Sequence, residues 1–224
     1  MFKKLFLVPM LLLFTAGVSA KADTIFALTN SACSSGCGVL PAGTVTLHQS
    51  GLDDVLVTVQ LTNDYSFRYA PDGHHFAFTF NLNVPSMPPL SITNVTSGPM
   101  SQTFQFLGLG LYADAGLGNF SYAFVCQTCT PGVPASPTQT LSFDLRVAGI
   151  GSTFSTSDFI SNGSNFFGVD VVGLDAAAGV GLTGNIGAPG PDPEISAVPE
   201  PSSLLLLGTG LVSSVGMLRR RFQK

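Results

Sequence analysis

The residues of this chain best suited to chemistry are four cysteines, which form two closely spaced pairs. Cys33 and Cys37 are separated by three residues, and Cys126 and Cys129 by two. Short-spaced pairs can bind zinc, but the usual four-cysteine site has two C-x-x-C units. A catalytic C-x-x-C pair should open a helix, whereas Cys126 ends a predicted strand. We therefore expect disulfides and favour the local bridges Cys33–Cys37 and Cys126–Cys129, with the cross-pairings left open.

Three histidines and a few aspartates are the remaining candidates for binding a metal ion. His74 and His75 are neighbours at the start of a predicted strand, so their side chains point to opposite faces and rarely share one ion. The third histidine is His48. Two aspartate pairs could contribute to a calcium site in a loop: Asp53 with Asp54, and Asp170 with Asp175. Such residues more often belong to ordinary turns, and we predict no metal ion and no cofactor.

Two glycine patterns fit nucleotide-binding fingerprints but lack the helix that such sites need. Residues 179–184 fit G-x-G-x-x-G, and residues 108–113 fit G-x-G-x-x-A. In a dinucleotide site the N-terminus of a helix after the glycines holds the pyrophosphate. The glycine- and proline-rich residues that follow here are poor helix formers. We assign both patterns to loops. Since the chain also has no G-x-S-x-G or H-E-x-x-H motif, we predict that it is not an enzyme.

Strands must position these residues, because a two-residue period dominates the body of the chain. In residues 55–62 the apolar side chains of Val55, Val57, Val59 and Leu61 share one face. The same alternation occurs in residues 76–82 and 141–147, and it is typical of half-buried antiparallel strands. Weaker candidates are residues 24–29, 44–49, 92–96, 103–107, 120–126, 166–172 and 180–186. A short helix is predicted only over residues 156–162.

About ten strands without βαβ spacing predict an all-β fold, an antiparallel two-sheet β-sandwich of the jelly-roll-like kind. The chain has 18 Phe and no Trp, so its core should be rich in phenylalanine. The sandwich is predicted over residues 23–187. From residue 188 to residue 201 the composition changes to glycine, proline, alanine and acidic residues, which is typical of a linker.

Charge is scarce and unevenly distributed. Charged residues make up 10% of the chain, against roughly 25% in an ordinary soluble domain. Between residues 23 and 197 there are twelve acidic residues and only two basic ones, Arg68 and Arg146, so the body carries a net charge of −10. Nucleic-acid binding requires clustered Lys and Arg. The body has no such cluster, and we therefore exclude a nucleic-acid partner.

The N-terminal segment, residues 1–22, has the pattern of a secretory signal peptide. Lys3 and Lys4 precede an apolar run over residues 5–18. The run ends in small residues that permit cleavage after Ala20 or after Ala22, and it is short for a membrane span. Export to an oxidising compartment also favours disulfides over free thiols.

The C-terminal segment has the pattern of a membrane anchor. Residues 202–218 are long enough to span roughly 25 Å as a helix, slightly less than a bilayer core of about 30 Å. Arg219, Arg220 and Arg221 follow. By the positive-inside rule they place the basic tail, residues 219–224, in the cytoplasm. The signal peptide places the body on the opposite side of the same membrane, so both ends agree on orientation.

Directly before the predicted helix lies the sequence Pro199-Glu200-Pro201. This motif, the helix and the terminal arginines together resemble the PEP-CTERM sorting signal recognised by exosortases. The resemblance covers about the last 27 residues and implies that a separate membrane protease-transpeptidase processes this chain. It also implies a Gram-negative bacterium that makes exopolysaccharide. The protein would be exported across the inner membrane, anchored transiently, and delivered to the cell surface or extracellular matrix.

Two functional hypotheses follow for the body. The first is a non-enzymatic structural or adhesive component linked to exopolysaccharide or biofilm. The alternative is a carbohydrate-binding module that recognises an exported polysaccharide. Such modules usually present exposed aromatic platforms, and this body has only four Tyr besides its Phe residues. A row of exposed aromatic rings would favour the alternative, and its absence would weaken it.

Overall fold

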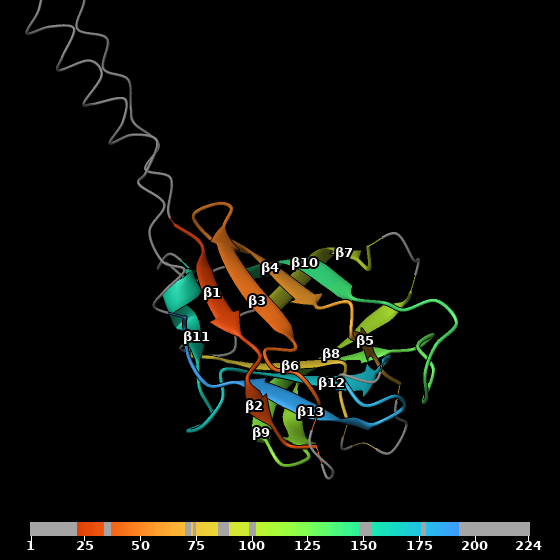
Figure 1. The fold of residues 1–224 in the computed structure, drawn as a ribbon. Helices are drawn as coiled ribbons and strands as arrows, with labels where there is room; N and C mark the ends of the chain where they lie inside the picture. Colours follow the sequence, from red (N-terminus) through yellow and green to blue (C-terminus); the bar gives the residue numbers. More distant parts are fainter. Residues whose placement is uncertain are drawn as a thin grey trace, which may run out of the picture. The chain divides into compact units, whose positions relative to one another are not determined.

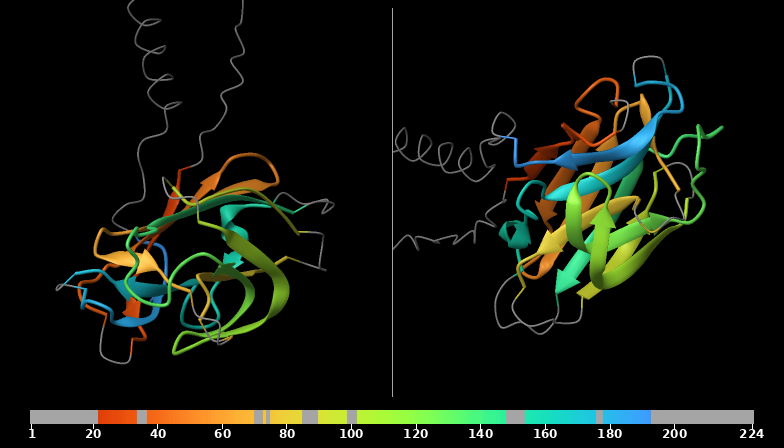
Figure 2. Two further views of the ribbon diagram at one scale, coloured as in Figure 1. Left: turned by 90° about the vertical axis from the view of Figure 1, so that its right-hand side faces the viewer. Right: turned by 90° about the horizontal axis from the view of Figure 1, so that it is seen from below.

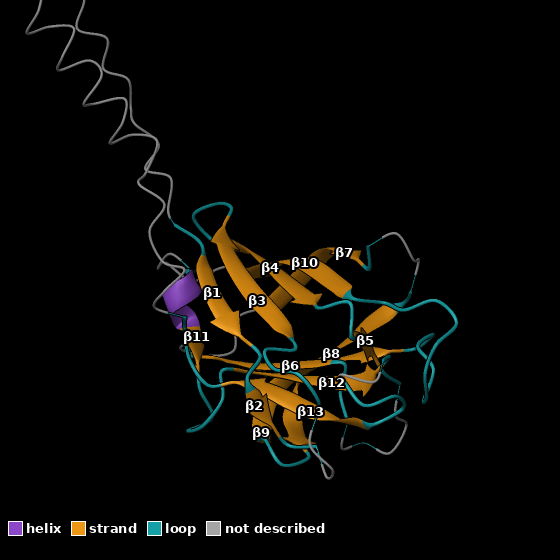
Figure 3. Ribbon diagram, in the orientation of Figure 1, coloured by secondary structure: helices purple, strands orange, loops and turns teal. Residues whose placement is uncertain are grey.

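The fold was analysed in a computed structural model that describes residues 22–33, 37–69, 73, 75–84, 90–98, 102–147, 154–175 and 178–192. These residues form two antiparallel sheets, one lying over the other (Figures 1 and 3). The fold is therefore all-β with two antiparallel sheets, as predicted. The predicted signal peptide, the membrane helix and the basic tail lie outside the described residues.

The smaller sheet has five strands in the order β1-β3-β4-β10-β7. Its strands show the predicted alternation: in β4 the side chains of Val55, Val57 and Val59 are fully buried, and the residues between them are only partly buried. The strand bounds are β1 Thr24–Ala27, β3 Gly43–Gln49, β4 Asp54–Leu61, β10 Thr140–Val147 and β7 Leu90–Thr96.

The larger sheet has eight strands, six of them in the order β2-β13-β12-β6-β9-β8. Of the other two, β5 pairs with β12 and β11 pairs with β6. Figure 2 shows the two sheets from two further sides. The strand bounds are β2 Asn30–Ser31, β5 Tyr65–Phe67, β6 Phe78–Leu82, β8 Phe104–Asp114, β9 Gly118–Cys126, β11 Phe159–Ile160, β12 Phe167–Gly173 and β13 Thr183–Ala188.

Phenylalanine side chains fill the space between the sheets, as the composition predicts. Phe143 of the smaller sheet contacts Phe124 of the larger sheet with ring centroids 4.6 Å apart. Within the larger sheet Phe78 stacks on Phe167 at 5.6 Å. All four are fully buried. Each such ring contributes roughly 1.5–3 kcal/mol through removal from water, so these contacts are a main source of the stability of the sandwich.

The predicted helix over residues 156–162 is wrong. The structure has a single 3-10 turn, Thr156–Asp158, followed directly by β11. The Ser155 amide donates to Asp158 Oδ2 at 2.7 Å, a contact typical of the start of a helix. Phe159 then pairs with Leu82 of β6. The backbone of Phe159 is therefore paired with strand β6 instead of continuing a helix.

The assignment of residues 108–113 to a loop is also wrong. They belong to β8, which continues to Asp114 through two register shifts opposite β9. Gly110 permits this path, because a Cβ there would lie within 2.8 Å of the Tyr112 hydroxyl oxygen. In the other glycine pattern Gly184 lies in β13, while Gly179 and Gly181 adopt positive φ in the preceding turn.

The last described residues remain paired to the sandwich beyond residue 187. Ala188 is the final residue of β13. Pro191 bridges to Phe26, and the Asp192 amide donates to the Ile25 carbonyl at 2.7 Å. Residues 188–192, which the composition assigns to a linker, therefore add a short edge contact to β1.

Candidate functional site

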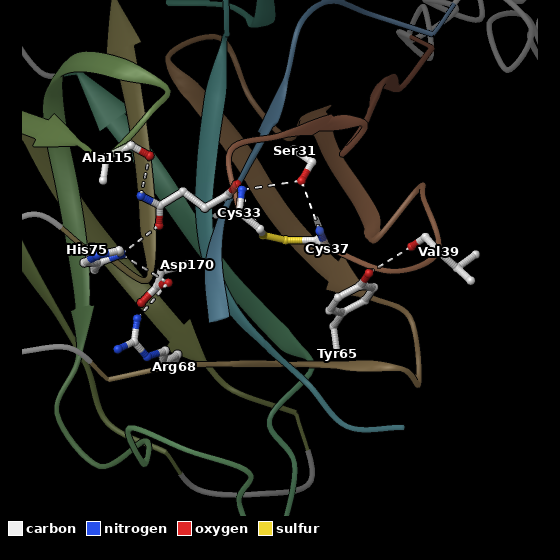
Figure 4. Close-up of a disulfide and its surroundings, with 10 residues drawn as sticks. Ser31, Cys33, Cys37, Val39, Tyr65, Arg68, His75, Ala115 and Asp170 are labelled. Atoms are coloured by element: carbon white, nitrogen blue, oxygen red, sulfur yellow. Dashed lines mark hydrogen bonds and ion pairs between the residues drawn. A yellow bond between two sulfur atoms is a disulfide. The ribbon is translucent and has the colours of Figure 1, made fainter. Parts of the chain in front are cut away.

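The structure joins Cys33 to Cys37 and Cys126 to Cys129, with Cα atoms 5.4 and 5.5 Å apart. These are the two local bridges that the spacing favours over the cross-pairings. Near the first bridge the Ser31 hydroxyl accepts hydrogen bonds from the amides of Cys33 and Cys37, at 3.4 and 3.3 Å (Figure 4). The described cysteines thus hold short loops and leave no thiol for catalysis or metal binding.

The two described histidines, His48 and His75, lie in different parts of the domain. His48 lies at the surface, where its Nδ1 atom is 2.6 Å from Asp23 Oδ1. His75 faces Asp170, with 3.5 Å between Nδ1 and Oδ1, and His74 lies outside the described residues. Within the described part of the chain no group of three His, Cys, Asp or Glu side chains could hold a metal ion.

Asp170 of β12 is the centre of a buried polar cluster on the outer side of the larger sheet. Its side chain is fully buried, and its Oδ1 lies 3.5 Å from Arg68 Nη1 (Figure 4). His75 Nδ1 also lies 3.3 Å from Asn185 Oδ1. Burial raises the pKa of Asp170, while the His75 hydrogen bond and the Arg68 charge oppose that shift. Arg68 therefore supplies the positive charge that a bound cation would otherwise have to supply.

Asp114, at the end of β8, lies in the same region, near His75 and Asp170. It is 2% exposed, and its Oδ2 accepts a hydrogen bond from the Thr79 hydroxyl at 2.9 Å. Oδ1 is buried and has no hydrogen-bond partner among the residues that the structure describes. Burial raises the pKa of Asp114 to about 7, and the nearby Asp170 adds to that shift. Near neutral pH this carboxyl is therefore partly protonated.

The turn between β8 and β9 covers this cluster. Asn185 Nδ2 donates to the Ala115 carbonyl at 3.0 Å, and Asn162 Nδ2 donates to the Leu117 carbonyl at 2.9 Å. Two glycines allow the close approach: a Cβ at Gly168 would collide with Asp114 and Thr79, and one at Gly187 would collide with Asn165. As a result β12 is buried along its whole length.

Of Asp170 and Asp175, which could have contributed to a calcium site, only Asp170 belongs to this cluster. Asp175 Oδ1 instead accepts the Ala178 amide at 2.8 Å, and its side-chain hydrogen bond raises the pKa of Asp64. Of the other pair, Asp54 Oδ1 lies 3.7 Å from Arg146 Nε at the surface. The sequence singles out His75 and Asp170 as candidate ligands but does not indicate that Arg68, Asp114 and Asn185 lie beside them, because the contacts that bring them together join distant segments.

Two cavities in the described domain carry no charged side chain or histidine. One, of about 210 Å³, lies beside Cys129 and is lined mainly by uncharged polar groups such as Gln102 and Ser136. The other, of about 560 Å³, is lined by Phe26, Phe159 and Phe166 together with residues near both ends of the described domain, such as Thr24 and Pro191. In these two cavities a general acid or base would have to come from outside the lining.

The described aromatic side chains form no exposed platform. Every Phe and Tyr in the described ranges is buried or half-buried, and the least covered include Tyr69 and Tyr112. Tyr112 is occupied in packing: its ring meets Phe76 edge-on at 5.1 Å, and its hydroxyl donates to the Leu107 carbonyl. Because the described residues present no row of exposed aromatic rings, the carbohydrate-binding alternative is weakened.

The segments that carry the sorting and export predictions lie outside the described residues, except for Ala22, which precedes β1. They include Ala20, the motif Pro199-Glu200-Pro201, the predicted span over residues 202–218, and Arg219, Arg220 and Arg221. In the ranges that the structure does describe, no helix has the length and apolar character needed to cross a membrane.

Comparison with known proteins places the motif in a family. The model of the PEP-CTERM protein-sorting motif matches residues 197–221. The match includes the Pro-Glu-Pro sequence, the predicted span and the three arginines. No curated protein and no solved structure matches the chain. Residues 197–221 of this chain therefore carry a PEP-CTERM protein-sorting motif, and the motif implies export and processing by an exosortase.

Proposed function

We propose that this protein is a non-enzymatic structural or adhesive component of the cell surface or extracellular matrix of a Gram-negative bacterium. The observation that carries the proposal is the sorting motif over residues 197–221. The composition of the body supports it, because a neutral to acidic β-sandwich held by two disulfides suits a passive role outside the cell. A link to exopolysaccharide or biofilm comes from the sorting system rather than from any site in the sandwich.

Delivery would proceed in three steps. The signal peptide directs export and is removed after Ala20 or Ala22. The span over residues 202–218 holds the protein in the inner membrane, with the arginines in the cytoplasm. The exosortase then cuts near Pro199–Pro201, where the two prolines keep the peptide extended and prevent it from joining the membrane helix.

The intact mass of the mature protein tests this proposal. We would measure it from the native host, with and without the exosortase gene. The expected result is a C-terminus near residues 199–201 only when the enzyme is present. Replacement of both Pro199 and Pro201 by Ala should reduce processing, whereas the matched change Pro193→Ala, outside the motif, should not. A C-terminus at Lys224 in both strains would refute exosortase processing.

A further inference from the structure

The middle of the chain is almost free of charge. From Gly73 to Phe143 the only Asp, Glu, Lys or Arg is Asp114, and Asp114 is buried. This stretch contains β6, β7, β8 and β9. All other charged residues of the described domain come from residues 22–69 and 144–192. One group of neighbouring strands therefore brings no charged side chain to the surface.

Two of these strands are sheet edges on the same side of the sandwich. β7 ends the smaller sheet, β8 ends the larger sheet, and the two lie next to each other. Natural edge strands usually carry a charged residue or a proline that discourages association with another chain. Neither kind of residue occurs in β7 or in β8 before Asp114. Bulges are the protection that these two strands have, in β8 opposite β9 and in β7 between Thr93 and Thr96 opposite β10.

Three leucines of β8 that lie within or beside its bulges are exposed. The register shifts opposite β9 lie between Phe106 and Leu109 and between Leu109 and Tyr112. Leu107, Leu109 and Leu111 are 37%, 49% and 80% exposed, and Val95 of the adjacent β7 is 39% exposed. We call these four side chains the leucine ridge. Since bulges interrupt a regular ladder, contacts here would be made by side chains rather than by continued strand pairing.

We propose that the leucine ridge is a contact surface between two copies of this chain, related by a twofold axis. A twofold contact uses the same patch on both copies, so the patch must not repel itself. The ridge meets this condition because it is neutral, whereas the charged parts of the domain are predominantly acidic and would repel their counterparts. A standard interface buries about 800 Å² per partner, so the neutral surface of β7–β9 must contribute around the ridge.

A membrane surface fits the ridge less well than a second copy. Peripheral membrane contacts combine apolar side chains with Lys or Arg that attract anionic lipid headgroups. β7, β8 and β9 contain neither Lys nor Arg. The inference depends on the surface of the sandwich alone and goes beyond the proposed function, because it holds whether or not an exosortase processes the tail.

Photo-crosslinking in the producing cells tests the proposal on the full chain. A benzophenone amino acid would replace Leu109, or, as a matched control, Leu52, which is 78% exposed but lies outside the neutral stretch. After irradiation, the probe at Leu109 should yield a covalent dimer at least tenfold more abundantly than the probe at Leu52. Mass spectrometry should identify the crosslinked peptide as a second copy of this chain.

A second pair of variants separates contact from misfolding. With the probe at Leu109, Leu111→Asp should reduce the dimer at least tenfold, because two like charges then meet at the twofold axis. Leu52→Asp, at a similarly exposed position, should leave the yield unchanged. The proposal is overturned by equal dimer yields from both probes, by no dimer, or by adducts only with lipid or other proteins. A dimer that survives Leu111→Asp would also overturn it.

Discussion

Replacement of Asp114 by Asn should make the stability of the domain less dependent on pH. The Asn side chain has nearly the same shape, and its Oδ1 can still accept the Thr79 hydrogen bond seen at 2.9 Å. It removes the ionisable group whose pKa burial raises from 3.8 to about 7. A shift of about 3 units corresponds to about 4 kcal/mol, at 1.36 kcal/mol per unit.

The sign of the effect follows from linkage. Below pH 3.8 the carboxyl is protonated in both the folded and the unfolded chain, so wild type and Asp114→Asn should have similar stability. Between pH 4 and pH 7 only the unfolded carboxyl ionises, and the free energy of unfolding of wild type should fall by about 1.4 kcal/mol per pH unit relative to the variant. Above pH 7 the variant should be more stable by up to about 4 kcal/mol.

Urea unfolding of the disulfide-intact protein, followed by circular dichroism from pH 4 to pH 8, measures this difference. Asp53→Asn, in a surface turn, controls for the loss of one negative charge. A difference between wild type and Asp114→Asn that stays constant with pH would refute the reasoning. So would a wild type that is more stable than the variant at pH 8.

Two further substitutions test the buried polar cluster around Asp170. Arg68→Met should destabilise the domain by about 3–5 kcal/mol, because it leaves the buried Asp170 carboxylate without the Arg68 charge. The double variant Arg68→Met/Asp170→Asn should recover part of that loss. A double variant no more stable than Arg68→Met would contradict the pairing of Arg68 with Asp170. Gly168→Ala should lower the free energy of unfolding in urea by about 1–3 kcal/mol, because its Cβ would collide with Asp114 and Thr79. Gly132→Ala is the control and should be nearly neutral, since a Cβ there would meet nothing within 4 Å. Equal effects of the two changes would show that Gly168 is not closely packed against its neighbours.

The sheets could be predicted because half-buried strands carry their pattern locally. Val55, Val57 and Val59 alternate with partly exposed residues in the structure as they do in the sequence. Each side chain is apolar or polar according to the face on which it lies, so no knowledge of the rest of the chain is needed. The same reasoning found the core strands rich in phenylalanine.

The buried polar cluster around Asp170 could not be predicted in the same way. Asp170 and Asn185 occupy the outer side of their strands, where a polar residue normally meets water. They are buried because the turn that contains Ala115, seventy residues before Asn185 in the chain, folds onto them. The one local sign was the pair of outer glycines, Gly168 and Gly187, directly opposite each other in the register. Glycine inside a strand often marks the close approach of another segment.

The helix error has a similar origin. Residues 156–162 have a cap residue and an acidic residue suited to a helix start, and the Ser155–Asp158 contact forms as such a start requires. The pattern says where a turn begins but not how long it continues. Pairing of Phe159 with Leu82 ends it, and that partner is supplied by a strand far earlier in the chain.

The short contact between β1 and the last described residues has a consequence for the order of events during export. Because the Asp192 amide bonds to the Ile25 carbonyl, the peptide entering the sandwich and the peptide leaving it run side by side. Neither end has to be threaded through the rest of the chain to complete the fold. Both ends of the described domain therefore lie at the same edge of the sandwich, and the domain can close without either end passing through it.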